Sequence, residues 1–294
     1  MLRAVAREGS LSAAARELGY TQPAVSHHIA KLEAEVGTAL LTRLGRGVQL
    51  TDAGLALVEH AEAVMSRLDA AAEEVAAIAG LRAGRVRLAA FPSASATLMA
   101  GALKRLREQH PGIAVSFEEA EPEDAFPLLR SGDLDLVLAF SYAADEDGRD
   151  LTSVPLLSDP TLAITRSGEG QIDLDELADE TWIAGCPRCR RHLLQVTGFD
   201  PRIEFATDDY MTVQSLVAAG LGVSLLPALA LRAAQRDDIV VRPVKGDPAR
   251  TIEAVVLTAE RRPPAVTAML DALREAAAAL AAEPQSVELG LQVL

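Results

Sequence analysis

The sequence has few cysteines, no long apolar run and a shortage of positive charge. Only two cysteines occur among 294 residues, both within residues 186–189, which excludes a disulfide-bonded scaffold. No stretch approaches the roughly 18 unbroken apolar residues that a membrane-spanning helix needs. Arg3, Arg7 and Glu8 have no apolar run behind them, which is not the pattern of a secretory signal. We therefore expect a cytoplasmic protein with no membrane partner.

The shortage of basic residues argues at first against a nucleic-acid partner. The chain has 28 Lys and Arg against 42 Asp and Glu, a net charge of −14. However, residues 1–58 carry six basic against five acidic side chains, whereas residues 85–294 carry 20 against 32. The negative charge of the whole chain therefore does not exclude nucleic-acid binding by the N-terminal segment, which is considered separately. Apolar residues make up 49% of the chain, which is enough for a packed core and excludes wholesale disorder.

The first 36 residues predict three short helices. Ser12 is expected to cap the second helix and Thr21 the third, with Pro23 in its first turn. One face of the third helix is apolar, at Val25, Ile29, Leu32 and Val36. The opposite face is polar or basic, as in a helix that reads the DNA major groove, although any small bundle of three helices shows such faces.

A turn at residues 45–47 separates two short extended pieces and predicts a wing next to the helices. Gln22 can contact adenine through two hydrogen bonds, and basic wing residues can contact phosphate or the minor groove. The full set of candidate DNA-binding residues is Thr21, Gln22, Pro23, Ser26, His27, His28, Lys31, Arg43 and Arg46.

A long helix is predicted from Asp52 to about Gly80, with Thr51 as its cap. Its apolar residues repeat with alternating spacings of three and four, a period of 3.5 that indicates a coiled coil between two chains. An ordinary amphipathic helix lying on its own domain is the alternative. The candidate dimerisation residues are Val58, Ala61, Met65, Leu68, Ala72 and Val75.

After Gly84 the pattern changes to strands that alternate with helices. Residues 85–91, 113–118 and 134–140 are predicted strands, separated by helices at 96–109 and 123–130. This order predicts a parallel sheet. A second set of short strands and helices follows between residues 162 and 258, so two α/β lobes with a cleft between them are expected.

The N-terminal motifs closely resemble those of the LysR-type transcriptional regulators. The matching segments are Gly9-Ser10-Leu11-Ser12, Ala14-Ala15, Leu18, Gln22-Pro23-Ala24-Val25-Ser26, Leu32-Glu33, Glu35-Val36-Gly37, Leu40-Leu41, Arg43, Leu50-Thr51 and Ala53-Gly54. A looser similarity extends along the chain, through Ala218-Ala219-Gly220-Leu221-Gly222-Val223 and Pro227. Two features depart from the family: its first helix normally starts one to two turns earlier, so Met1 is expected to be a late or trimmed start, and Leu41 replaces the usual aromatic residue.

The resemblance implies an α+β multidomain protein that binds promoter DNA, responds to a small-molecule effector and assembles as a dimer or a dimer of dimers, here a homotetramer. The expected parts are a winged helix-turn-helix domain (1–57), a linker helix for dimerisation (58–84), a two-lobed α/β domain like a periplasmic binding protein (85–283) and a C-terminal tail (284–294). Lobe 1 is expected at about 85–160 and 259–283, and lobe 2 at about 161–258.

The effector is expected where strands end and helices begin, because free N–H groups and a partial positive charge gather there. The resemblance places first-lobe contacts at Ser93 and Ser95, although both hydroxyls could merely cap the helix. A small anion or polar metabolite would suit this site, but Asp208 could favour a cation or a neutral ligand. The candidate effector-binding residues are Ser93, Ala94, Ser95, Cys186, Phe205 and Thr207.

The sequence offers no constellation of catalytic residues, no glycine-rich phosphate loop and no requirement for a cofactor. Cys186-Pro187-Arg188-Cys189 with His192 leaves three interpretations open: half of a metal site, a redox pair, or a loop that enters a helix. A structural zinc site would need four ligands. The alternative to a regulator is a solute-binding protein or an α/β enzyme with an accessory helical domain.

Overall fold

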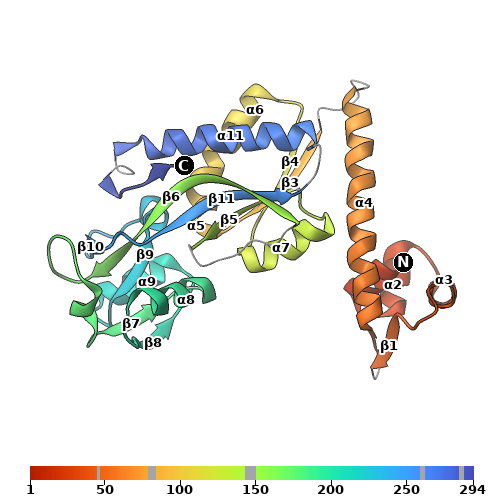
Figure 1. The fold of residues 1–294 in the computed structure, drawn as a ribbon, viewed down its shortest axis with the longest axis horizontal. Coiled ribbons are helices and arrows are strands. Elements are labelled where there is room, and N and C mark those ends of the chain that lie inside the picture. The colour runs from red at the N-terminus through yellow and green to blue at the C-terminus, as the bar shows by residue number, and fades with distance from the viewer. Residues whose placement is uncertain (45–46, 79–83, 143–149, 259–261, 285–287) are drawn as a thin grey trace.

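A computed structural model of the chain describes residues 1–44, 47–78, 84–142, 150–258, 262–284 and 288–294. It contains a small N-terminal helical domain, a long helix and an elongated α/β domain (Figure 1). None of the helices in the described ranges is both long and apolar enough to cross a membrane.

The N-terminal domain consists of three helices and a two-stranded hairpin. The elements are α1 (Leu2–Glu8), α2 (Leu11–Leu18), α3 (Gln22–Val36), β1 (Leu41–Leu44) and β2 (Gly47–Leu50). The predicted cap at Ser12 is wrong: α2 starts at Leu11, and the side chain of Ser10 accepts the hydrogen bond from the N–H of Ala13. The chain turns immediately before Ser10, because Gly9 adopts a left-handed conformation there.

One apolar core joins this domain to the start of the long helix α4 (Asp52–Ile78). Its buried members are Leu2, Ala4, Val5, Ala14, Ala15, Val25, Ile29, Leu40 and Val58. As predicted, Thr51 caps α4, since its hydroxyl accepts a hydrogen bond from the N–H of Gly54. A Cβ at Gly54 would lie 2.2 Å from the carbonyl oxygen of Leu40, so only glycine allows α4 to approach the preceding loop this closely.

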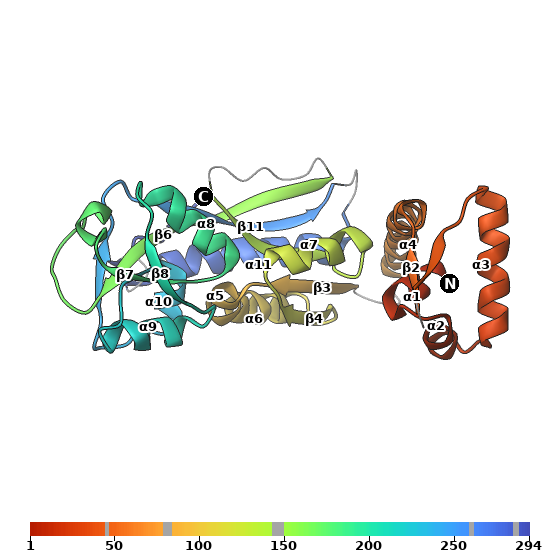
Figure 2. The same ribbon diagram turned by 90° about the horizontal axis from the view of Figure 1, so that it is seen from below.

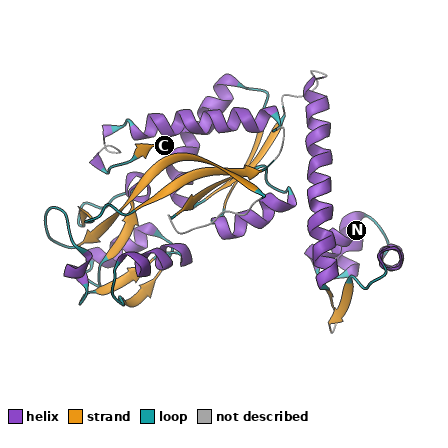
Figure 3. Ribbon diagram, viewed as in Figure 1, coloured by secondary structure: helices purple, strands orange, loops and turns teal. Residues whose placement is uncertain are grey.

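The larger domain is built on a sheet whose core is parallel. Strand β3 (Arg85–Ala90) lies between β4 (Ala114–Glu119) and β5 (Leu136–Ser141) and runs parallel to both, as the sequence predicts. Alternate residues of β3 face opposite sides. Val86 and Leu88 belong to a core shared with α6 (Ala100–Gln109) and α11 (Pro264–Ala281), and Ala89 to a second core shared with α7 (Pro122–Ser131). Helices therefore cover both faces (Figures 1 and 3).

Two long antiparallel strands connect the two parts of the α/β domain. They are β6 (Leu151–Thr165) and β11 (Ala249–Leu257). The first half of β6 was not predicted from the sequence, because Pro155 and Pro160 interrupt the strand pattern. The sheet order is β10-β6-β11-β5-β3-β4, where β10 is Val240–Pro243, and β9 (Ser224–Pro227) and β12 (Gln292–Val293) also pair with β6.

The second lobe contains a small sheet and its own core around Trp182. The parallel strands β7 (Thr181–Ala184) and β8 (Arg202–Ala206) lie next to each other, and the Trp182 indole donates a hydrogen bond to the carbonyl of Leu177. The remaining elements are α5 (Pro92–Ala94), η1 (Ser95–Met99), η2 (Leu174–Leu177), α8 (Pro187–Val196), α9 (Tyr210–Ala218), α10 (Ala228–Ala233) and β10 (Val240–Pro243).

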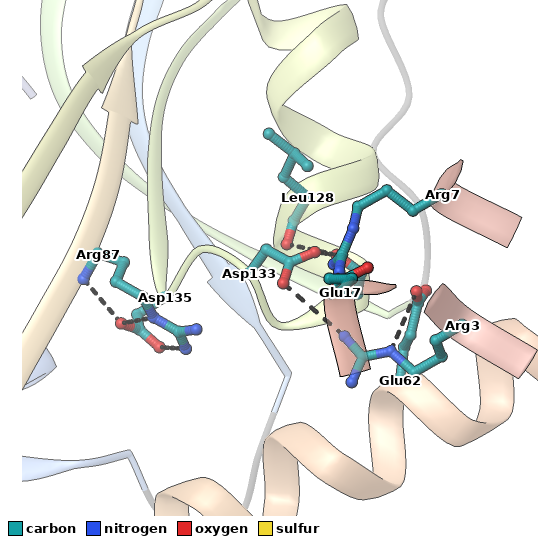
Figure 4. Close-up of polar contacts among 9 residues, drawn as sticks. Arg3, Arg7, Glu17, Glu62, Arg87, Leu128, Asp133 and Asp135 are labelled. Carbon is teal, nitrogen blue, oxygen red and sulfur yellow. Dashed lines mark hydrogen bonds and ion pairs between the residues drawn. The ribbon is translucent and has the colours of Figure 1, made fainter. Parts of the chain in front are cut away.

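The N-terminal domain meets the α/β domain at α7. Helices α4 and α7 are in contact, and the guanidinium of Arg3 lies 3.4 Å from a carboxylate oxygen of Glu62 on α4 and 3.8 Å from one of Asp133 (Figure 4). Asp133 follows the last turn of α7. One arginine therefore connects α1, α4 and the loop after α7.

Candidate functional sites

Helix α3 presents a polar face to the outside of the N-terminal domain. It lies on the side of that domain farthest from the α/β domain (Figure 2). Val25 and Ile29 are buried in the core that also contains residues of α1 and α2, whereas Val36, at the end of the predicted apolar stripe, is 46% exposed. The exposed candidate DNA-binding residues of this segment are Thr21, Gln22, Pro23, His27, His28 and Lys31, with Ser26 half-buried.

Hydrogen bonding within α3 orders part of this surface. The side-chain amide of Gln22 donates to the hydroxyl of Ser26 at 2.8 Å, and the amine of Lys31 lies 3.9 Å from a carboxylate oxygen of Glu35. Thr21 occupies the cap position as predicted, but its side chain makes no capping hydrogen bond. The side-chain amide of Gln22, in the first turn of α3, is therefore held by Ser26 and remains exposed to solvent.

The predicted wing is the hairpin of β1 and β2. Its register pairs Leu41 with Leu50 and Leu44 with Gly47. Arg43 lies on β1, and Arg46, the other basic residue expected to contact phosphate, lies outside the described residues. The hairpin and α3 thus belong to the same small domain, as a winged helix-turn-helix requires.

The apolar stripe of α4 is exposed over most of its described length. Met65, Leu68 and Val75 are 44%, 59% and 66% exposed. Ala72 is also exposed and Ala61 half-buried. Val58 is the exception, because the start of α4 packs into the core of the N-terminal domain and buries this residue there. The prediction that Val58 belongs to the dimer seam is therefore wrong.

The first-lobe effector candidates lie at the carboxyl end of β3. Ser93 and Ala94 are buried in α5, and the Ser93 hydroxyl accepts a hydrogen bond from the guanidinium of Arg250 at 2.9 Å. Ser95 donates its proton to the carbonyls of Ala90 and Phe91, both at 3.1 Å. Neither hydroxyl caps α5, whose cap position is Phe91, so that alternative is wrong.

The second-lobe candidates gather where β7 and β8 end. Cys186 caps α8, Phe205 is half-buried against the main core, and the N–H of Thr207 donates to the carbonyl of Ala184 at 3.0 Å. Parallel pairing of Ala184 with Ala206 brings the carboxyl ends of both strands to one edge. Cys186, Phe205 and Thr207 are therefore neighbours in space although about 20 residues separate them in sequence.

A buried arginine at the junction of β6, β11 and α5 was missed by the sequence reasoning. The side chains of Arg250 and Asp159 are both 0% exposed, and Nε of Arg250 lies 2.8 Å from a carboxylate oxygen of Asp159. Nη2 donates to Ser93, while Nη1 is buried and has no hydrogen-bond partner among the described residues. The guanidinium also lies over the rings of Phe91 and Phe140, at 5.0 and 4.4 Å from their centroids.

Two tyrosines complete this group, which we call the Arg250 cluster: Ser93, Tyr142, Asp159, Tyr210 and Arg250. Burial by itself lowers the pKa of Arg250, but the pKa is raised above its ordinary value, and the charge of Asp159 is the largest contribution that raises it. Burial raises the pKa of both tyrosines, so they remain protonated. A hydrogen bond joins Tyr210 to Ser93. The signal in the sequence was a charged residue within a largely apolar strand, Asp159 in β6 and Arg250 in β11, although β11 also carries Glu253.

A separate surface hollow of about 430 Å³ lies between strands β6 and β10 and the C-terminal residues. It is lined by Leu162, Gln235, Asp237, Val241, Pro243, Glu288 and Leu289. It contains none of the predicted effector-binding residues. The Arg250 cluster and this hollow are therefore distinct places at which a ligand could be sought.

The fold defines a class of protein: a winged helix-turn-helix domain joined by a long helix to a two-lobed α/β domain. The bacterial regulatory helix-turn-helix family of the lysR type matches residues 1–55, and the LysR substrate binding domain matches residues 79–278. The chain belongs to the LysR family of transcriptional regulators, and the family and fold class predicted from the sequence are confirmed.

Individual relatives agree with this assignment. The probable transcriptional regulator LrrA of Synechococcus elongatus is 30% identical over 283 residues, covering 94% of this chain and 95% of the relative. The dual regulator OxyR of Escherichia coli is 30% identical over 268 residues, covering 86% of each chain. Both relatives are transcriptional regulators. The alternative, a solute-binding protein or an enzyme with an accessory domain, is therefore not favoured.

Solved structures show the same fold. A full-length variant of OxyR from Pseudomonas aeruginosa has a TM-score of 0.71 at 24% identity, with 93% of each chain covered. The LysR family regulator CbnR has a TM-score of 0.62 at 24% identity, covering 94% of this chain and 96% of CbnR. The similarity extends through both domains and the linker helix.

The Arg250–Asp159 pair predicts a large effect of a small substitution. Asp159→Asn leaves the buried guanidinium without its counter-charge, so the free energy of unfolding should fall by about 3–5 kcal/mol. Asp150→Asn is the matched control, because Asp150 pairs with Arg130 at the surface and a surface pair contributes less than about 1 kcal/mol. Urea unfolding of both variants measures the difference, and equal losses would contradict the importance of the buried pair.

Proposed function

We propose that this LysR-type regulator binds promoter DNA through α3 and the β1–β2 wing. The observation that carries the proposal is the exposed polar face of α3, whose N-terminal residues are free to meet base edges in the major groove. The hairpin next to it can contact the sugar-phosphate backbone. This function requires no catalysis and places the protein in the cytoplasm with the DNA.

Dimerisation is the second part of the proposal. The exposed stripe of Met65, Leu68, Ala72 and Val75, with Ala61 at its start, is the surface on which two copies of α4 pack against each other. A pair of chains then positions two α3 helices to read two half-sites. Further contacts between the α/β domains would give the dimer of dimers.

The third part is a small effector held at the Arg250 cluster between the two lobes. Nη1 of Arg250, which has no hydrogen-bond partner within the described part of the chain, is a buried donor, and the hydroxyl of Tyr210 lies in the same cluster. A buried donor without an acceptor carries a free-energy cost that a ligand oxygen can remove. This chemistry favours a small polar molecule with a carboxylate or another hydrogen-bond acceptor, with Ser95, Cys186, Phe205 and Thr207 around it.

The DNA-binding proposal is tested with Gln22→Ala. Loss of a base-reading amide should cost about 1–3 kcal/mol of binding free energy at one base position and relax the preference there. The measurement is fluorescence anisotropy with DNA from the region upstream of the chain's own gene. Gln171→Ala, an exposed glutamine in the α/β domain, is the control. An unchanged affinity and preference for Gln22→Ala would show that α3 does not read the bases.

The seam on α4 is tested with Leu68→Glu. A carboxylate in an apolar seam loses its hydration, so the α4 pairs should separate and the mass of the assembly should fall at concentrations where the native assembly is intact. His60→Glu adds the same charge at an exposed position of α4 outside the stripe and should leave the assembly intact. Light scattering distinguishes the two, and an unchanged mass for Leu68→Glu would remove the coiled-coil proposal.

The effector site is tested with a panel of small mono- and dicarboxylates and inorganic phosphate under reducing conditions. A compound that binds only the folded chain raises its melting temperature. Tyr210→Phe removes one hydroxyl from the Arg250 cluster and should weaken the response, whereas Tyr20→Phe, in the N-terminal domain, should not. A compound bound equally by both variants would move the site elsewhere, with the hollow beside Glu288 as the next place to examine.

A further inference from the structure

The two cysteines of the chain lie side by side where α8 begins. Their sulfur atoms are 2.8 Å apart, and the N–H of Cys189 donates to Sγ of Cys186 at 3.3 Å. A disulfide bond is about 2.05 Å long, so less than 1 Å of approach would join the sulfurs. The spacing of three residues at a helix start already orients both side chains toward each other.

The surroundings make the two thiols unequal. The Cys186 thiol donates its proton to Sγ of Cys189, and this hydrogen bond, with help from the charge of Arg250, lowers the pKa of Cys189 despite its burial. The same hydrogen bond and burial raise the pKa of Cys186. Glu121 opposes ionisation of both. Cys189 is also the more exposed of the two residues, since Cys186 is only 6% exposed. Cys189 is therefore the thiol that ionises more readily, and we assign it to meet an external reagent first.

Arg188, between the two cysteines, ties α8 to the first lobe. Its Nη1 donates to the carbonyl of Phe140 at 3.0 Å, and its Nε lies 3.6 Å from a carboxylate oxygen of Glu123 on α7. The guanidinium also lies 5.8 Å from the centroid of the Phe140 ring. Any change in the backbone of residues 186–189 therefore acts on a contact between the two lobes.

We propose that Cys186 and Cys189 form a reversible disulfide by exchange with a low-molecular-weight disulfide, and that closure of this ring changes the Arg188 contacts between the lobes. The pair supplies only two thiolate ligands, and the described residues contain no group of three or more side chains that could hold a metal ion. Two sulfurs this close suit a bond between them better than a four-ligand metal site.

The exchange proceeds in two balanced steps. The Cys189 thiolate attacks one sulfur of the small disulfide R–S–S–R, which forms a mixed disulfide and releases R–S⁻. Cys186 then gives its proton to the released thiolate, and its sulfur attacks Sγ of Cys189 and displaces the second R–S⁻. The second R–S⁻ takes up from solvent the proton that Cys189 released when it ionised, so the protein loses two electrons and two protons in total and the small disulfide becomes two thiols.

The experiment equilibrates the full chain in buffers of varied ratio of oxidised to reduced glutathione, followed by alkylation and intact-mass measurement. The native chain should pass from two alkylated cysteines to none, with a mass lower by two hydrogens and no attached glutathione. Dithiothreitol should restore both thiols. A chain that keeps both thiols in the most oxidising buffer, or that forms only disulfides between chains, would overturn the proposal.

Single variants test the assigned order of attack. Cys186→Ser should trap glutathione on Cys189, because no second thiol resolves the mixed disulfide, whereas Cys189→Ser should remain largely reduced. Circular dichroism checks that both variants are folded. If either variant does not fold, the glutathione titration of the native chain still tests whether the disulfide forms. The reverse pattern would show that Cys186 is the attacking thiol and would overturn the assignment of Cys189.

Hydrogen exchange of the native chain tests the consequence for the lobes. Oxidation should increase exchange at the start of α8 and around Phe140 and Glu123, with no change in the N-terminal core around Val25. Arg188→Met should show raised exchange at Phe140 and Glu123 in both redox states. Unchanged exchange on oxidation would separate disulfide formation from the Arg188 contact and would remove that half of the proposal.

Discussion

The ion pair between Arg250 and Asp159 holds together elements that are distant in the chain. Arg250 lies on β11 and Asp159 on β6, the two strands that connect the lobes, and Asp159 also accepts a hydrogen bond from the N–H of Leu229 in α10. Arg250 reaches α5 through Ser93. Removing two charges from water costs free energy, and this cost is offset because Arg250 and Asp159 pair with each other and each makes a further hydrogen bond. The same group of contacts fixes the helix start at which an effector is proposed to bind.

Helix α7 occupies a second central position, because it touches both ends of the molecule. Near its start, Glu123 pairs with Arg188 and Arg191 of α8 in the second lobe. Just beyond its last residue, Asp133 approaches Arg3 of α1 (Figure 4). Individual ion pairs of this exposure contribute little stability. Their importance lies in position: α7 and the loop that follows it contact the lobe junction, the linker helix and the DNA-binding domain.

Much of the local structure could be predicted because it depends on neighbouring residues. Apolar spacing indicated α3, α4 and the parallel strands β3, β4 and β5. The errors arose where another part of the chain intervened. Ser10 rather than Ser12 caps α2, because the turn at Gly9 places it there. The first half of β6 was not predicted, because prolines interrupt its strand pattern and the strand forms through its pairing with β11.

The sequence by itself determined the helix-turn-helix, the wing, the linker helix with its 3.5-residue repeat, and the alternation of strands and helices. These features follow from periodicity and capping over a few turns of chain. Only the tertiary structure decided that Arg250 joins Asp159, 91 positions away, and Ser93, 157 positions away. It also decided which end of α4 remains exposed, since Val58 is covered by its own domain whereas Leu68 is not. A contact between distant residues leaves no periodic trace in the sequence, because its geometry exists only after the sheet has brought the strands together.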